Sequence, residues 1–137
     1  MKLRELSLVF SGVTLAALFV ACGPGGNGGD AGVEAKLSVL KDEIFVPRCG
    51  NASCHGGANP SAGLKLDADD LHAELVDVDS SLAGWKYVVA GDPANSLILQ
   101  ILKGPVDGVP KMPQGLSLDD ADIQLVEEWI ANGANND

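Results

Sequence analysis

Apolar residues recur at helical spacing near residue 40 of this 137-residue chain. Four of them, separated by three or four positions with charged residues between, would share one helix face: Val33, Leu37, Leu40 and Ile44. Pro47 is expected to stop this helix, because proline has no backbone N–H and its ring disturbs the preceding turn. The pattern therefore predicts an amphipathic helix that ends just before a segment containing cysteine.

Two further helices follow the same spacing in the middle of the chain. Leu71 and Leu75 predict a short helix, for which Asp67 would act as the N-cap. Asp92-Pro93 is a typical helix start, because a capping acid precedes a proline in the first turn. Four aliphatic residues would form the buried face of that helix before Gly104 ends it: Leu97, Ile98, Ile101 and Leu102.

Ser117 and Asp120 resemble a capping box at the start of a last helix, which would run to Gly133. Its apolar face is expected to consist of Leu118, Ala121, Leu125, Val126, Trp129 and Ile130. No segment shows the sustained alternation of apolar and polar residues that is typical of a strand. The expected fold class is therefore all-α, with helices joined by loops.

The first 21 residues have the pattern of a bacterial export signal, with basic residues followed by an apolar run. The end of this segment, Phe19-Val20-Ala21-Cys22, resembles the lipobox of bacterial lipoproteins, although a smaller aliphatic residue is usual in place of Phe19. The resemblance implies that Cys22 is lipidated and becomes the new N-terminus. The alternative is ordinary secretion, which would leave Cys22 as a free thiol.

Three regions follow from this division of the chain: a signal peptide at 1–21, a glycine-rich tether at 22–33 and one folded domain at 34–137. The expected location is the periplasm or cell envelope, with lipid on Cys22 as an anchor to the outer membrane. The net charge of −10 argues against a nucleic-acid partner, because phosphate binding needs the opposite sign. With few aromatic residues, the domain would have a thin core, which a large apolar cofactor would help to fold.

The segment Cys49-Gly-Asn-Ala-Ser-Cys54-His55 carries the candidate chemistry. Covalent haem attachment needs two thiols, each of which adds to a vinyl group, followed by a histidine that becomes an axial ligand of the iron. Four residues separate the cysteines here instead of the usual two. They are small, and a glycine and an asparagine among them tolerate unusual backbone angles, so the loop could still present both sulfurs to one haem edge.

Two other interpretations of these residues remain open at this point. A Cys49–Cys54 disulfide would suit an exported chain, and would make it a lipoprotein binding domain with no haem. Zinc would need a fourth ligand beside the two thiolates and His55, and His72 is the only other histidine. The charged neighbours of His72 favour a solvated helix face for it instead.

Met112 is a candidate for the second axial ligand. It is the only methionine beyond the signal segment, and it lies in a loop rich in glycine and proline, between Lys111 and Pro113. A thioether is a suitable soft ligand for haem iron, and a loop can place it on the face opposite the histidine.

The order of these features resembles a small class I c-type cytochrome. It is most similar to the planctomycete-type cytochrome c domain, through Gly91-Asp-Pro-Ala-Asn-Ser-Leu97, the Met112-Pro113 loop and the final Trp129-Ile-Ala-Asn-Gly-Ala134. The resemblance implies an all-α domain packed around one covalently bound haem c. It also implies that Cys49 and Cys54 form the thioether bonds, and that His55 and Met112 bind the iron.

The activity that this resemblance implies is electron transfer to and from redox protein partners, not enzymatic turnover. If both axial positions are filled by protein ligands, no position on the iron is open to a substrate. The sequence also contains no nucleophile–base pair or phosphate-binding loop that would indicate a separate enzyme. Four further side chains could contact the haem or its propionates: Arg48, Trp85, Tyr87 and Trp129.

Overall fold

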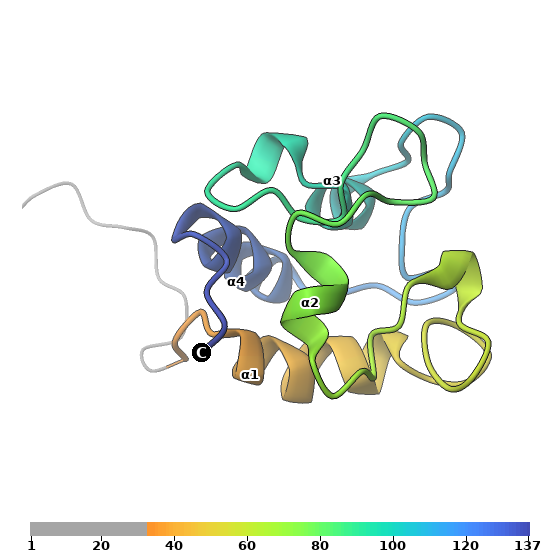
Figure 1. Ribbon diagram of the computed structural model, residues 1–137, viewed down its shortest axis with the longest axis horizontal. Helices are drawn as coiled ribbons and strands as arrows, with labels where there is room; N and C mark the ends of the chain where they lie inside the picture. The colour runs from red at the N-terminus through yellow and green to blue at the C-terminus, as the bar shows by residue number, and fades with distance from the viewer. Residues whose placement is uncertain (1–32) are drawn as a thin grey trace, which may run out of the picture.

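The computed structural model describes residues 33–137. The predicted signal segment, Cys22 and all of the predicted tether except Val33 lie outside the described residues. Within 33–137 the protein consists of helices and loops without a β-strand, and its only ladder pairings are isolated bridges between loops (Figure 1). The all-α fold class is therefore confirmed. No helix in this part of the chain has the length and apolar character needed to cross a membrane.

The first helix is longer than its sequence pattern predicts. α1 (Leu37–Leu40) continues directly into a π-helical segment, η1 (Lys41–Cys49), which contains Pro47. The prediction that Pro47 stops the helix is wrong, because η1 pairs amides with carbonyls five residues back, as in Gly50 N to Phe45 O at 2.7 Å. This wider turn leaves more room for the proline ring, which in an α-helix clashes with the carbonyl four residues back. Cys49 consequently lies at the end of a helix, where it is buried.

The two ends of the predicted helical face differ in burial. Leu37, Leu40 and Ile44 are buried, whereas Val33 precedes the helix and is 56% exposed, so its predicted place on the buried face is wrong. Leu37 N donates to Asp137 Oδ1 and Ser38 N donates to the Asp137 carbonyl, both at 3.0 Å. Figure 1 shows the C-terminus beside the start of α1. Asp137 therefore satisfies amides that the first turn of a helix leaves without partners.

Replacing Asp137 with alanine is expected to lower the free energy of unfolding by about 1 kcal/mol, because Leu37 N–H loses its side-chain acceptor. Asp137→Asn is the matched control, since its amide oxygen can still accept this bond. Urea denaturation followed by circular dichroism would measure both variants. Equal stability of the alanine variant and the wild type would show that the contact does not cap the helix.

The short helix α2 (Leu71–Leu75) is present, but it is capped by a different residue from the one predicted. Asp70 Oδ1 accepts a hydrogen bond from Ala73 N at 3.1 Å, which makes Asp70 the N-cap. Asp67 instead turns its carboxylate toward Gly57 N and Lys65 Nζ. The prediction for Asp67 is wrong because tertiary partners compete for its carboxylate.

Asp92 begins a short 3₁₀ turn, η3 (Pro93–Asn95), by accepting from Asn95 N. The predicted helix start at Asp92-Pro93 is therefore wrong for the longer helix, because Ser96 is extended and α3 (Leu97–Lys103) begins only after it. Leu97, Ile98 and Leu102 are buried as predicted, and Ile101 is partly buried. The chain leaves α3 at Gly104, as expected.

The last helix, α4 (Asp120–Ala131), lacks the predicted capping box. Its N-cap position is Asp119, which makes no side-chain cap hydrogen bond, and Leu118 is buried before the helix begins. Val126, Trp129 and Ile130 form the most deeply buried part of α4, whereas Ala121 is exposed. The chain therefore remains extended through Asp119 while Leu118 reaches the core, and the helix starts later than the sequence suggests.

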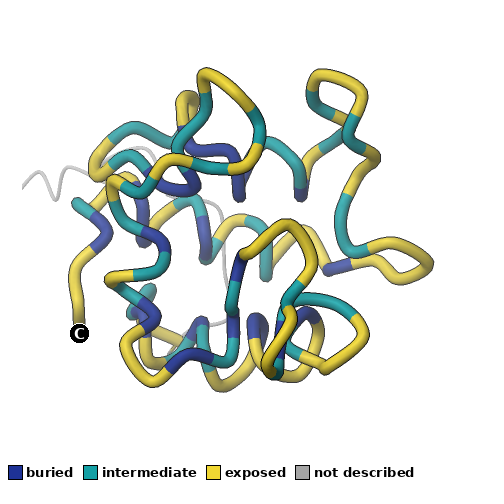
Figure 2. The backbone as a smooth tube through the Cα atoms, turned by 45° about the vertical axis from the view of Figure 1, so that its right-hand side comes forward, coloured by how far each residue is buried: buried dark blue, intermediate teal, exposed yellow. Residues whose placement is uncertain are grey.

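α4 packs against both α1 and α3, which brings the two ends of the domain together. The core lies between them, and its largest fully buried side chains include Trp129, Phe45 and Leu40. Figure 2 shows the buried stretches facing the middle of the molecule, with exposed loops around its edge. Gly91 N donates to Ile130 O at 2.8 Å, so the segment before α3 is also joined to α4.

Candidate functional site

Segments that are distant in the sequence meet around one cleft. The end of η1 and the following loop contribute Cys49, Cys54 and His55, and the loop between α3 and α4 contributes Met112. All four predicted site residues of the described chain therefore line the same cavity, which has a volume of about 260 Å³. This volume is slightly below the roughly 300–1,000 Å³ range of small-molecule sites.

The walls of the cleft are mostly apolar. Side chains from η1, the 64–66 segment, α3 and the chain just before α4 line it: Phe45, Leu64, Leu66, Ile98, Ile101, Leu102 and Leu118. Leu116 also lines the cleft and is 63% exposed, so it lies at the mouth. Arg48 is the single lysine, arginine, aspartate or glutamate among the lining residues in 33–137. Such walls suit a large apolar ring, and an arginine at their edge suits an anionic substituent.

The loop that carries the motif is held by its own backbone. His55 N donates to Cys49 O at 3.0 Å, and both Cys54 N and Gly56 N donate to Asn51 O. Asn51 Oδ1 accepts from Ser53 N and Ser53 Oγ, which forms a local Asx turn. The four inserted residues therefore form a compact turn that returns the chain to the end of η1.

Both cysteines of the motif are free, so the Cys49–Cys54 disulfide is not formed in the structure. Burial raises the pKa of the Cys49 thiol to about 11, with a smaller contribution from Cys54, so this thiol is protonated at neutral pH. Cys54 is partly exposed, and its sulfur lies 3.9 Å from Ser53 Oγ. Two thiols at one side of an apolar cleft match the requirement for two thioether bonds to one ring.

His55 has one ring nitrogen engaged with the protein. Its Nδ1 lies 3.1 Å from the Ser61 carbonyl oxygen, which can only accept a hydrogen bond, so Nδ1 carries the proton. In the neutral ring Nε2 then has the free lone pair. Metal-binding histidines are typically oriented in this way, by a carbonyl or carboxylate on the other nitrogen.

Met112 is positioned by the end of α3. Its backbone N donates to Ile101 O at 2.9 Å, and its side chain is partly buried among the residues packed on the core. Pro113 and Gln114 line the same cleft. The polypeptide therefore places a thioether in the cavity that also contains the histidine.

The donor set of the cleft fits covalently bound haem with two axial protein ligands. The residues present are two free thiols, an imidazole with its Nδ1 already bonded, a thioether and apolar walls. A zinc site is not supported, because residues 33–137 contain no cluster of three His, Cys, Asp or Glu side chains suited to a metal ion. His72 is bonded through Nε2 to Ala134 O at 2.9 Å and does not line the cleft.

The three aromatic side chains that could have contacted a haem do not line the cleft. The polar atom of each is bonded elsewhere: Trp85 Nε1 to Asp107 Oδ2, Tyr87 Oη to Ala62 O, and Trp129 Nε1 to Asn135 O. Of the four residues considered for this role, only Arg48 lies at the site.

Sequence reasoning missed two contributions to the site. Ser61 acts through its backbone carbonyl, which has no side-chain signal in a sequence. Gly56 approaches Gly50 so closely that an added Cβ would lie 1.9 Å from Gly50 O. A Gly-Gly pair after the histidine is a general turn signal, but it does not reveal which backbone atom lies opposite.

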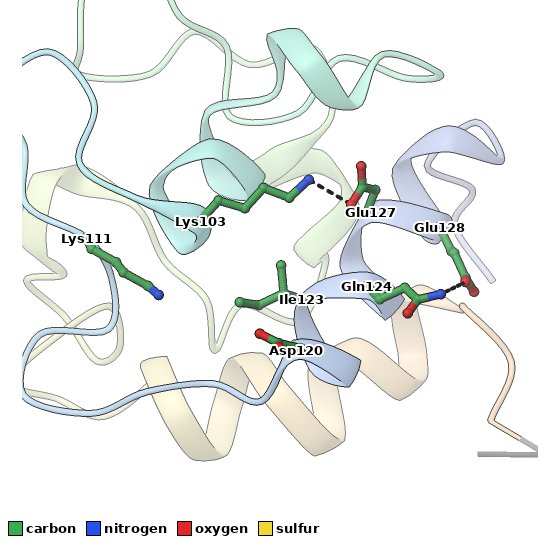
Figure 3. A pocket seen from close by; sticks show the side chains of 7 residues that line it. All are labelled: Lys103, Lys111, Asp120, Ile123, Gln124, Glu127 and Glu128. Carbon is green, nitrogen blue, oxygen red and sulfur yellow. Dashed lines mark hydrogen bonds and ion pairs between the residues drawn. The ribbon is translucent and has the colours of Figure 1, made fainter. Parts of the chain in front are cut away.

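A second hollow lies between the end of α3 and α4, and is lined mainly by charged side chains (Figure 3). The ion pair between Lys103 Nζ and Glu127 Oε2, at 2.7 Å, connects the two helices across it. None of the predicted site residues lines this hollow. Both side chains of this ion pair are more than 40% exposed, so it contributes little to stability. The hollow adds no residue to the candidate haem site.

Comparisons of this chain with protein-family models, with curated proteins and with solved structures find no significant match.

Proposed function

We propose that this protein is a monohaem c-type cytochrome that carries electrons. The observation that supports the proposal is the convergence of Cys49, Cys54, His55 and Met112 on one apolar cleft. The first three residues precede α2 in the sequence, and Met112 follows α3. Cys49 and Cys54 would hold the haem c through thioether bonds, and His55 and Met112 would bind its iron. The haem, when bound, supplies one-electron Fe(III)/Fe(II) chemistry.

The chain's own residues have four roles in this proposal. Ser61 O holds the His55 ring with Nε2 free to coordinate, and the backbone bond from Met112 to Ile101 keeps the thioether at the cleft. Leu64, Leu102 and the other apolar walls would exclude water from the haem, which would raise its potential by disfavouring the more highly charged oxidised state. Arg48 offers a cation to a propionate or to an anionic partner surface. If His55 and Met112 both bind the iron, the protein would transfer electrons and would not transform a bound substrate.

We also propose that the protein is exported and lipidated on Cys22, which would anchor it in the cell envelope, at the outer membrane. The support is the sequence alone, because Cys22 follows a signal-like segment and precedes a glycine-rich stretch. Its partners would then be redox proteins of the periplasm or envelope. Intact mass of the purified protein would show the diacylated N-terminal cysteine together with any haem.

Covalent haem is the test of the central proposal. Protein made in a bacterial host with haem-attachment machinery should retain its haem after acid–acetone extraction, and should give the pyridine haemochrome spectrum of haem c. Cys54→Ser should shift that spectrum to the position typical of a haem with one free vinyl group, because only one thioether can form. Replacing both Cys49 and Cys54 with serine should abolish covalent attachment.

Two results would contradict the proposal. Complete extraction of the haem from the wild type would exclude thioether attachment. A haem-free wild type whose mass is lower by two hydrogens, and restored by a thiol reductant, would instead establish the Cys49–Cys54 disulfide.

A further inference from the structure

The segment from Ser61 to Asp67 runs back beside the loop that carries His55. Leu66 N donates to His55 O at 2.7 Å, and Gly57 N donates to Asp67 Oδ2 at 2.9 Å. The same segment supplies the Ser61 carbonyl that accepts from His55 Nδ1. The histidine is therefore bonded to this segment through its ring, its own carbonyl and the second residue after it.

Asp67 has both carboxylate oxygens engaged. Oδ2 accepts from Gly57 N, and Oδ1 accepts from Lys65 Nζ at 2.7 Å. The Gly57 amide, followed by Lys65, holds the pKa of the Asp67 carboxyl below its ordinary value. The carboxylate is therefore ionised at neutral pH, and hydrogen bonds to an ionised acceptor are stronger than those between neutral groups.

The turn that Asp67 contacts has no side chains with which to hold itself. It consists of Gly56 and Gly57, and Gly57 has a φ of +73°, in the left-handed region that favours glycine. Among the described residues, Asp67 provides the one side-chain hydrogen bond to the backbone of His55, Gly56 and Gly57. A glycine pair has a large backbone entropy to lose, so a fixed anchor at its far end matters for the residue before it.

We propose that Asp67 is a positioning residue for His55: its carboxylate fixes the Gly56–Gly57 turn and thereby holds the imidazole on Ser61 O, with Nε2 left for coordination. The role of Nε2 rests on the proposed haem function, but the positioning is a property of the polypeptide. Asp67 does not touch the ligand position itself. It acts through Gly57 and the turn.

The test measures the solvent exchange of the His55 Nδ1 proton by ¹⁵N NMR in the full chain, as purified with or without haem. Asp67→Ala should accelerate this exchange about tenfold or more, because the turn loses a bond to a charged acceptor. Asp67→Asn should stay within about threefold of the wild type, because its amide oxygen can still accept from Gly57 N. Where haem is bound, the reduction potential should change in the alanine variant and be restored in the asparagine variant.

Asp70→Ala is the matched control. It removes the same kind of carboxylate-to-amide bond, Asp70 Oδ1 to Ala73 N, but at α2. It should lower stability and leave the His55 proton within about threefold of its wild-type exchange rate. If Asp67→Ala has no larger effect than Asp70→Ala, or if Asp67→Asn behaves as Asp67→Ala does, the proposal is overturned.

Measurements on the wild type keep the proposal testable even if the alanine variant does not fold. The Gly57 amide should be protected from exchange, since it is bonded to Asp67, and rapid exchange of Gly57 would overturn the proposal. These measurements do not require haem. A failure of the haem test with a protected Gly57 amide would therefore remove the cytochrome function and leave the positioning role. Covalent haem with a rapidly exchanging Gly57 amide would instead support the cytochrome function and overturn the positioning role.

Discussion

Replacing Met112 with alanine is expected to lower the reduction potential of the haem-loaded protein by on the order of 0.1–0.3 V, part of the roughly 0.8 V that axial ligands span. The physical reason is the loss of a soft thioether, which favours Fe(II) over Fe(III). Haem attachment should persist in this variant, because Cys49, Cys54 and His55 are unchanged. Redox titration followed by visible absorption would measure the potential.

Leu116→Ala is the control for this experiment. Leu116 lies in the same loop and lines the same cleft, but it provides no ligand atom. It should leave the potential much closer to that of the wild type. The oxidised wild type and the Leu116 variant should both show the weak sulfur-to-iron band at the red end of the spectrum, and the Met112 variant should lack it.

An unchanged potential and a retained band in Met112→Ala would exclude Met112 as the ligand. His72 is the only other histidine in the sequence. In the structure its Nε2 is bonded to Ala134 O, away from the cleft, so His72→Ala should not alter the band.

Gly56→Ala is expected to lower the free energy of unfolding by about 3 kcal/mol or more, and to reduce haem attachment with it. The added methyl group would lie 1.9 Å from Gly50 O and 2.7 Å from Gly50 C. These are backbone atoms at the end of η1, so no flexible side chain can move aside. The turn from Cys49 to His55 would have to open, which separates the thiols from the imidazole.

Gly104→Ala is the matched control for this substitution. Gly104 ends α3, an added Cβ would meet no atom within 4 Å, and its φ of −175° is extended backbone that any residue adopts. Its free energy of unfolding should stay within about 0.5 kcal/mol of the wild type. Denaturant titration would measure both variants, and a Gly56 variant as stable as the Gly104 variant would show that the close approach is not required.

The helices illustrate what a local pattern can predict. Leu37, Leu40 and Ile44, and likewise Val126, Trp129 and Ile130, are buried because a period of 3.6 residues places them on one face, whatever they pack against. Helix ends were predicted less well. Asp67 and Asp70 are both acids near the start of α2, but Asp70 directly precedes Leu71 and caps the helix, whereas Asp67 accepts from Gly57 N.

In the candidate site, too, some features follow from the sequence and others only from the fold. The chemistry of Cys49, Cys54, His55 and Met112 is inherent in their side chains, and their order along the chain predicts a candidate haem site before any fold is known. Their convergence on one cleft depends on α3, α4 and the loop between them. The Ser61 carbonyl and the Asp67 carboxylate could not be predicted, because each acts through a partner that only the folded loop brings near.

The sequence by itself determined the helical class, most of the buried helix faces and the candidate ligand atoms, since these depend on local periodicity and on side-chain chemistry. The tertiary structure alone decided that the first helix continues past Pro47 to Cys49, that Asp137 caps α1, and that His55 presents Nε2. The physical reason is that hydrogen-bond partners are chosen by distance in space. A carboxylate or carbonyl with several amides within reach bonds to the one that packing places closest.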